Sequence, residues 1–217
     1  MFCGPSAAPE SRHAAPVGLS HLAGMTLSVR SPDELIAVIP HLLGFKPEES
    51  LVFLPMSSEL PAARVDLPTT PDDREVVWNS IRDAYGRHAQ PGSSLAIVCI
   101  TADRETATDV GHEFAARFNS IGIDTRVALW ADETRWADLD TGDMGLQTED
   151  ARERIAAATV LTGRAQPAAN RDSLAESLVG DREPVAALLS EIRGAARQNT
   201  PKAEGRWALA RMHRFHG

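Results

Sequence analysis

One apolar run, "SSLAIVCIT" at residues 93–101, constrains the fold of this chain more than any other stretch. An uninterrupted run of this kind is typical of a strand at the centre of a sheet that is covered on both faces. Helical patterns at residues 71–88 and 103–122 flank it, and a second strand pattern follows at residues 124–131. This alternation predicts an α/β protein with a mixed, mostly parallel sheet flanked by helices, in which two βαβ units place three parallel strands in the core.

The stretch "SPDELIAVIPHLLGFKPEESLVFLP", residues 31–55, concentrates several local signals. Ser31 and Glu34 form the S-x-x-E pattern that caps the start of a helix, and Gly44 suits the left-handed position that ends one. The apolar "LVFLP" has the pattern of a strand, and "ARVDLP" at residues 63–68 is predicted to pair with it in the antiparallel sense. A helix end, a turn and a strand start therefore account for these signals.

The same two segments carry a resemblance to a known family. "VRSPDELIAVIPHLLGFKPEESLVFLP" (residues 29–55) and "ARVDLP" resemble the actinobacterial family called domain of unknown function 4192, and residues 152–178 fit its later helices more loosely. The resemblance spans about residues 26–190. It implies a fold but no established activity. Many members are expected to carry a cysteine- and proline-rich loop after the fourth strand, whereas residues 132–147 here contain no cysteine.

The patterning divides the chain into three parts. Residues 1–25 carry no periodic apolar pattern and are predicted to be a disordered N-terminal tail, with Met25 as an alternative start. Residues 26–147 are predicted to form the α/β core domain. Residues 148–217 are predicted to be a helical C-terminal segment, packed on the core or trailing from it, with helix breaks at Gly163 and at "GDREP".

Charge and cysteine content narrow the function classes. The net charge of -8 argues against affinity for nucleic acid or for anionic membranes, and no apolar run approaches the ~18 residues of a membrane span. A basic tail, "GRWALARMHRFHG", is the one feature that favours nucleic acid, through Arg206, Arg211 and Arg214. Two cysteines give no disulfide framework, and Cys99 is predicted to be a buried, inert thiol, so a cytoplasmic location is expected.

Catalytic and metal-binding motifs do not emerge from the sequence. Neither a glycine-rich phosphate loop nor a G-x-S-x-G elbow is present, and His112-Glu113 lacks the second histidine of a zinc motif. His88 and His112 are predicted to be exposed helix residues. The acidic "DLDTGD" at residues 138–143 departs from a calcium loop and is predicted to be a solvated loop. No catalytic residue, no metal ligand and no cofactor is therefore predicted.

One candidate ligand site remains. Ligands of α/β proteins bind beyond the carboxyl ends of the strands, where Asp66, Thr101, Asp103 and Arg104 lie in this chain. The helix that begins near Asp103 could hold an anion at its N-terminus. The alternative is simple capping of that helix by Thr101 or Asp103.

These patterns predict a non-enzymatic module that binds a protein or a small molecule. The alternative is a small-molecule enzyme that uses the crevice at the strand ends. Nucleic acid and membranes are not expected as partners, and the sequence is compatible with a homodimer.

Overall fold

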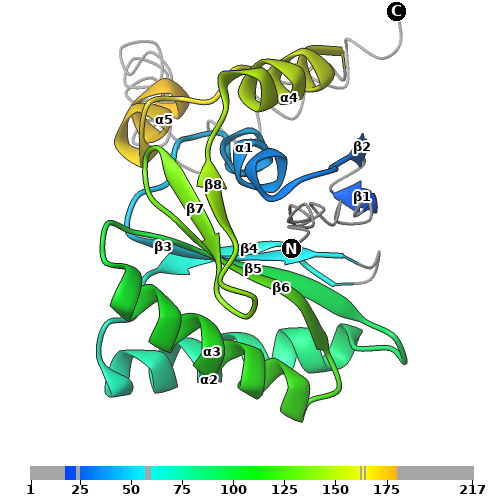
Figure 1. Ribbon diagram of the computed structural model, residues 1–217, viewed down its shortest axis with the longest axis vertical. Helices are drawn as coiled ribbons and strands as arrows, with labels where there is room; N and C mark the ends of the chain where they lie inside the picture. Colours follow the sequence, from blue (N-terminus) through cyan, green and yellow to red (C-terminus); the bar gives the residue numbers. More distant parts are fainter. Residues whose placement is uncertain (1–17, 23–24, 57–59, 162, 164, 180–217) are drawn as a thin grey trace, which may run out of the picture. The chain divides into compact units, whose positions relative to one another are not determined.

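The computed structural model describes residues 18–22, 25–56, 60–161, 163 and 165–179. Residues up to Leu174 belong to one compact unit, and a second unit begins at Ala175. The first unit contains a six-stranded sheet with the order β4-β3-β5-β6-β7-β8 (Figure 1). The strands are β3 (Ser50–Pro55), β4 (Ala63–Asp66), β5 (Ser94–Ile100), β6 (Asp124–Ala131), β7 (Arg135–Asp138) and β8 (Met144–Leu146).

Helices cover both faces of this sheet (Figure 1). Two of them pack on one face and two on the other, so the predicted α/β class and the mixed sheet flanked by helices are confirmed. A further helix near the C-terminal end of the described residues agrees with the helical segment expected there. The helices are α1 (Pro32–Leu43) and α4 (Glu149–Leu161) on one face, α2 (Pro71–His88) and α3 (Arg104–Ser120) on the other, and α5 (Arg171–Leu178).

The pairing of the strands differs from the prediction in one respect. β4, β5, β6 and β8 run in the same direction, but only β5 and β6 pair in parallel. β3 lies between β4 and β5 and is antiparallel to both, so it separates the first of the three expected parallel strands from the other two. The reason is that α2 carries the chain across β3 to its far edge, and β5 therefore does not pair with β4.

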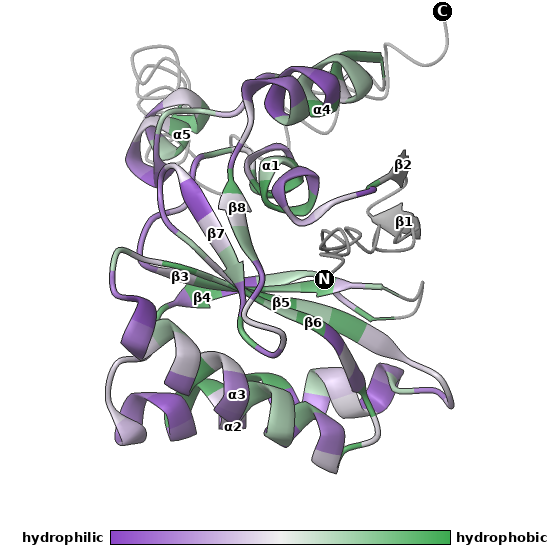
Figure 2. Ribbon diagram, viewed as in Figure 1, coloured by the Kyte–Doolittle hydropathy of each residue, from purple (hydrophilic) through white to green (hydrophobic). Residues whose placement is uncertain are grey.

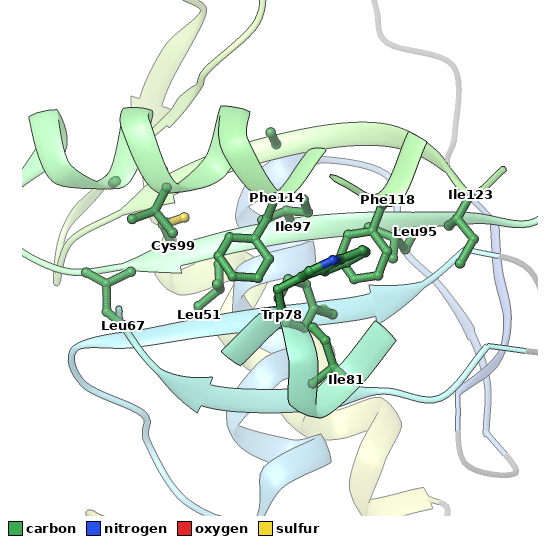
Figure 3. Close-up of a cluster of buried hydrophobic side chains, with 14 of the residues drawn as sticks. Leu51, Leu67, Trp78, Ile81, Leu95, Ile97, Cys99, Phe114, Phe118 and Ile123 are labelled. Carbon is green, nitrogen blue, oxygen red and sulfur yellow. The ribbon is translucent and has the colours of Figure 1, made fainter. Parts of the chain in front are cut away.

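Aromatic side chains fill the face under α2 and α3. Phe53 of β3 lies 5.6 Å from Phe114 and 5.1 Å from Phe118, measured between ring centroids. Trp78 and Tyr85 of α2 pack edge-on against Phe118. Figure 3 shows this cluster between the strands and the two helices. Cys99 faces the same core and is buried, as predicted, and burial raises the pKa of its thiol to about 12, which disfavours the reactive thiolate.

Aliphatic side chains fill the face under α1 and α4, among them Val52, Leu54 and Val98 from the strands. Figure 2 shows the central strands as hydrophobic and the outer sides of α2 and α3 as hydrophilic. Within the described part of the chain, no helix is long and apolar enough to cross a membrane.

The caps of α1 follow the sequence prediction in part. Gly44 ends the helix with φ of 81°, as predicted. Ser31 is the N-cap residue, but its hydroxyl donates to Asp33 instead of accepting from the helix. Glu34 accepts from the backbone N–H of Arg30, at 2.6 Å, and not from Ser31. The predicted capping box is therefore replaced by a related arrangement shifted by one residue.

Two short hairpins add to the predicted elements, one before α1 and one after β6. Gly18–Leu22 (β1) pairs with Met25–Ser28 (β2) as an antiparallel hairpin, in a region that includes part of the predicted disordered tail. Backbone pairing of such short strands leaves little trace in a sequence pattern. The hairpin β7–β8 was not predicted. α4 lies in the same compact unit as the sheet, and residues 180–217, with the "GDREP" break and the basic tail, lie outside the described residues.

Candidate functional site

A cavity of about 1010 Å³, called the rim cavity here, lies where β5 and β6 end. One side of α1, the strand ends, the first turns of α4 and residues 166–170 line it. Its volume lies at the upper end of the ~300–1,000 Å³ that is typical of small-molecule sites. The carboxyl ends of strands in α/β sheets are where such sites usually lie, so the position agrees with the general rule.

The stretch after α1 builds one wall of the rim cavity. Because Gly44 adopts a left-handed conformation, the chain turns sharply after the helix and brings Lys46 to the cavity. Two backbone hydrogen bonds then hold residues 166–170 in place: Ala168 N–H donates to the Gly44 carbonyl at 2.8 Å, and Lys46 N–H donates to the Ala168 carbonyl at 3.1 Å. The stretch that carries the family resemblance therefore also shapes this cavity.

α1 contributes an unusual surface to the cavity. Pro40 lies inside the helix and has no N–H to donate to the carbonyl of Ile36, and both residues line the cavity. His41 is next to it, with Nδ1 3.1 Å from Thr159 Oγ1 of α4. Burial lowers the pKa of the His41 imidazole, which favours its neutral form near neutral pH.

Carboxylates outnumber cations around the rim cavity. The cationic side chains Lys46 and Arg152 face Glu133 at 3.9 Å and Glu149 at 3.1 Å. The structure gives the lining residues Glu48 and Glu153 no ion pair with any described residue. The cavity therefore has an excess of negative charge, which favours a ligand with a positive group.

Asp132 forms a rigid corner of the same cavity. Its carboxylate accepts from the backbone N–H groups of Thr134 and Arg135 at 2.7 and 2.6 Å, and it pairs with the Arg135 guanidinium at 2.9 Å. Partial burial opposes ionisation, but the hydrogen bonds from Thr134 and Arg135 outweigh it and lower the pKa of Asp132. This carboxylate is committed to the turn between β6 and β7.

Two of the sequence-predicted site residues lie at the strand ends without lining the rim cavity. Asp66 is exposed and pairs with Arg64 on the same edge strand at 2.7 Å. Thr101 is buried; its hydroxyl donates to the Glu49 carboxylate at 2.8 Å and accepts from the backbone N–H of Asp103. Thr101 thus ties the start of β3 to the end of β5.

The other two predicted residues lie at the start of α3. Asp103 is its N-cap, and its carboxylate accepts from the backbone N–H groups of Glu105 and Thr106 at 3.0 and 3.2 Å. Its hydrogen bonds with Thr106, by side chain and backbone, lower the pKa of Asp103. The helix N-terminus therefore already holds a carboxylate, as the capping alternative expected. Arg104 instead lies over the Trp130 ring, 5.6 Å from its centroid, in a different cavity.

The four predicted residues thus lie beyond the carboxyl ends of β4 and β5, but they do not line one cavity. Sequence reasoning missed His41, Lys46 and Glu153, which the fold brings together from α1, the following turn and α4. The sequence signal that could have pointed to these residues was Pro40 inside a predicted helix that ends at Gly44. The contact between this helix and α4 depends on tertiary packing. His88 and His112 are exposed on their helices, as predicted.

The acidic stretch at residues 138–143 connects two strands. Asp138 ends β7 and accepts from the backbone N–H groups of Asp140 and Thr141, both at 2.9 Å, while Asp140 and Asp143 are exposed. Among the described residues, no group of three or more His, Cys, Asp or Glu side chains is arranged to hold a metal ion. The stretch is the connection of a β-hairpin.

These features define a three-layer α/β domain with an acidic cavity at the carboxyl ends of its two parallel-paired strands. The chain belongs to the family described as "Domain of unknown function (DUF4192)", which matches residues 32–215. The comparisons with curated proteins and with solved structures gave no match.

Proposed function

We propose that this protein is a binding module for a small organic cation, such as an amine, in the rim cavity. The observation that carries the proposal is the charge of that cavity. Glu48 and Glu153 line it without ion-pair partners among the described residues, while its cations face carboxylates. A cationic ligand placed between these two carboxylates would gain charge-assisted hydrogen bonds in a partly enclosed site.

The hydrogen bonds that polar groups on the cavity lining already make favour a binding function over a catalytic one. Thr134 is the hydroxyl-bearing residue among the described lining residues, and its Oγ1 lies 3.2 Å from the Asp132 carboxylate, within the turn. The Asp132 carboxylate is occupied by the hydrogen bonds of the same turn. Among the described lining residues there are thus recognition groups but no hydroxyl or thiol nucleophile beside a free base.

A second candidate function is an enzyme that uses His41 as a base. A partly buried imidazole with a lowered pKa lines the cavity, and neutral imidazole is the form that accepts a proton. In that case His41→Asn would abolish turnover while substrate still binds. In a binding module, His41→Asn would change affinity at most modestly.

Calorimetric titration of the full chain tests the proposal. Spermidine and putrescine are the cationic probes, and succinate and citrate at matched ionic strength are the anionic ones. We expect binding of the cations and none of the anions. The double variant Glu48→Gln/Glu153→Gln should weaken cation binding about tenfold or more, since two charge-assisted contacts are lost.

Glu105→Gln is the matched control, because this exposed carboxylate lies on α3 and away from the cavity lining. It removes one negative charge without touching the lining, so the affinity for cations should stay the same. A loss of binding free energy in the control that is half as large as in the double variant would mean that the cations respond only to net charge, because the control removes one charge and the double variant two. Preferential binding of succinate or citrate would refute the proposal.

A further inference from the structure

A second cavity, of about 400 Å³, lies beside the sheet edge that β8 forms. We call it the Trp130 groove, and Arg104, Trp130, Arg135, Met144 and Leu146 line it. The guanidinium carbons of Arg104 and Arg135 lie 5.6 and 5.8 Å from the Trp130 ring centroid. The groove thus joins an apolar floor to two cationic groups.

β8 is an edge strand without the usual protection. Met144 and Leu146 are each 66% exposed, and the strand "MGL" carries neither charge nor proline. The opposite edge, β4, carries Arg64 and Asp66, which form an ion pair on that strand. Proteins commonly place charges on edge strands because an uncharged edge invites another strand to pair with it. Of the two edges, β8 is therefore the one that is open to pairing.

The register of the β7–β8 hairpin shows which backbone groups are available. Gln147 N–H donates to the Thr134 carbonyl, and Asp138 N–H donates to the Asp143 carbonyl. Since inward and outward positions alternate in an antiparallel pair, Met144 and Leu146 direct their backbone N–H and carbonyl groups away from β7. Two residues of β8 thus present both side chains and backbone groups to a docking strand.

The charge of the groove selects the kind of partner. The described residues that line it include Arg104 and Arg135 but no carboxylate. Arg135 pairs with Asp132, whereas the structure gives Arg104 no carboxylate partner among the described residues. In a chain with net charge -8, a local excess of positive charge next to an apolar edge is complementary to an acidic segment.

We propose that β8 and the Trp130 groove dock an extended segment of a partner protein. The segment would add a strand to β8, place apolar side chains against Met144 and Leu146, and place a carboxylate near Arg104. A second copy of this chain fits less well. Antiparallel pairing of two β8 strands would bring Arg104 and Arg135 of one copy close to the same two arginines of the other copy. The described lining residues of the groove include no carboxylate that could offset this repulsion.

Fluorescence anisotropy with labelled peptides tests this site on the full chain. One seven-residue peptide alternates valine and threonine before two C-terminal aspartates, and a matched peptide ends in two lysines. We expect the acidic peptide to bind about tenfold tighter than the basic one. Leu146→Lys should weaken its binding about tenfold, because it places a charge on the docking edge.

Val76→Lys is the matched control, since Val76 is a 69% exposed apolar residue on α2, and it should leave binding unchanged. Arg104→Gln should reduce the preference for the acidic peptide while both peptides still bind. The proposal is overturned if the acidic peptide does not bind at millimolar concentration, if both peptides bind equally, or if Leu146→Lys has no effect. A dimer in sedimentation that Leu146→Lys dissociates would instead make a second copy the occupant.

Discussion

The two faces of the sheet are packed by different means. Under α2 and α3, aromatic rings from β3 and both helices interlock, and Phe53, Phe114 and Phe118 are fully buried. Under α1 and α4, the buried hydrophobic residues are aliphatic, and the rim cavity of about 1010 Å³ lies at the end of that layer. Rings fill volume with few side chains, whereas smaller residues at a strand end leave room.

Polar contacts hold the helices of the second face together. Glu34 of α1 pairs with Arg154 of α4, and Thr148 Oγ1 donates to Asp33 at 2.8 Å just before α4 begins. These directional contacts fix the two helices while leaving a space between them at the strand ends. The comparison teaches that one face provides stability by close packing and the other provides a shaped space.

The largest expected effect concerns the aromatic face. Phe53→Ala should lower the free energy of unfolding by about 3–5 kcal/mol, because a large cavity would open among rigid rings. Ile36→Ala on α1 is the matched truncation on the other face and should cost about 2 kcal/mol, since Ile36 already borders an open cavity. Urea denaturation of both variants measures the difference. Equal losses would show that the two faces are packed alike.

The next effect concerns the contact between α1 and α4. Glu34→Ala should lower the free energy of unfolding by about 2 kcal/mol, less than for a fully buried pair, because the Arg154 side chain is 35% exposed. The double variant with Arg154→Met should recover part of this loss. A coupling energy below about 0.5 kcal/mol in that double-mutant cycle would mean that the pair does not hold the two helices.

A smaller effect is expected where α1 ends. Gly44→Ala should cost about 1 kcal/mol, because φ of 81° strains any residue with a Cβ. The added Cβ would lie 3.5 Å from Leu174, an ordinary contact, so the cost comes from the backbone. Gly86→Ala in α2 is the control and should raise the free energy of unfolding. Nothing lies within 4 Å of the Cβ that the substitution adds, and alanine favours a helix. A stabilised Gly44→Ala would contradict this assignment.

The smallest effect is a pH dependence on the cavity face. Burial lowers the pKa of His41 in the folded state below its ordinary value of 6.5, so the unfolded chain takes up the proton first. The contribution of neutral His41 to the free energy of unfolding is therefore fully present above pH 6.5, and it is lost as the pH falls through the pKa of His41 in the folded state. Thermal melts from pH 8 to pH 5 should show a smaller decline for His41→Asn than for the natural chain. Identical declines would place the acid sensitivity elsewhere.

Local patterns predicted the elements whose formation is local. The run from Leu95 to Ile100 predicted a central strand, and Gly44 predicted a helix end, because burial and left-handed backbone leave direct marks on residue choice. The pairing order was not predicted, because α2 can return the chain to either edge of β3 without a change in its own pattern. β8 was missed because three residues are too few to show an alternation.

The rim cavity was not predicted, because its walls come from segments that are distant from one another in the sequence. The end of the sheet at which the parallel strands terminate was predicted from strand direction. The residues Asp66, Thr101, Asp103 and Arg104 do lie at that end. The rim cavity, however, depends on α4 and residues 166–170 returning to α1, and such contacts between distant segments follow from packing. Ligand binding by the four predicted residues remains a prediction.

The backbone hydrogen bonds that join Ala168 to Gly44 and Lys46 have a consequence for how the rim cavity tolerates mutation. Both are main-chain hydrogen bonds, so they do not depend on which side chains follow one another in residues 166–170. Gln166 can therefore be exchanged for another residue while the wall stays attached, whereas the Asn170 side chain accepts from the backbone N–H of Ser173 at 2.8 Å and caps α5. Mutation at residue 166 can therefore change the surface of the cavity on this side without loosening the sheet.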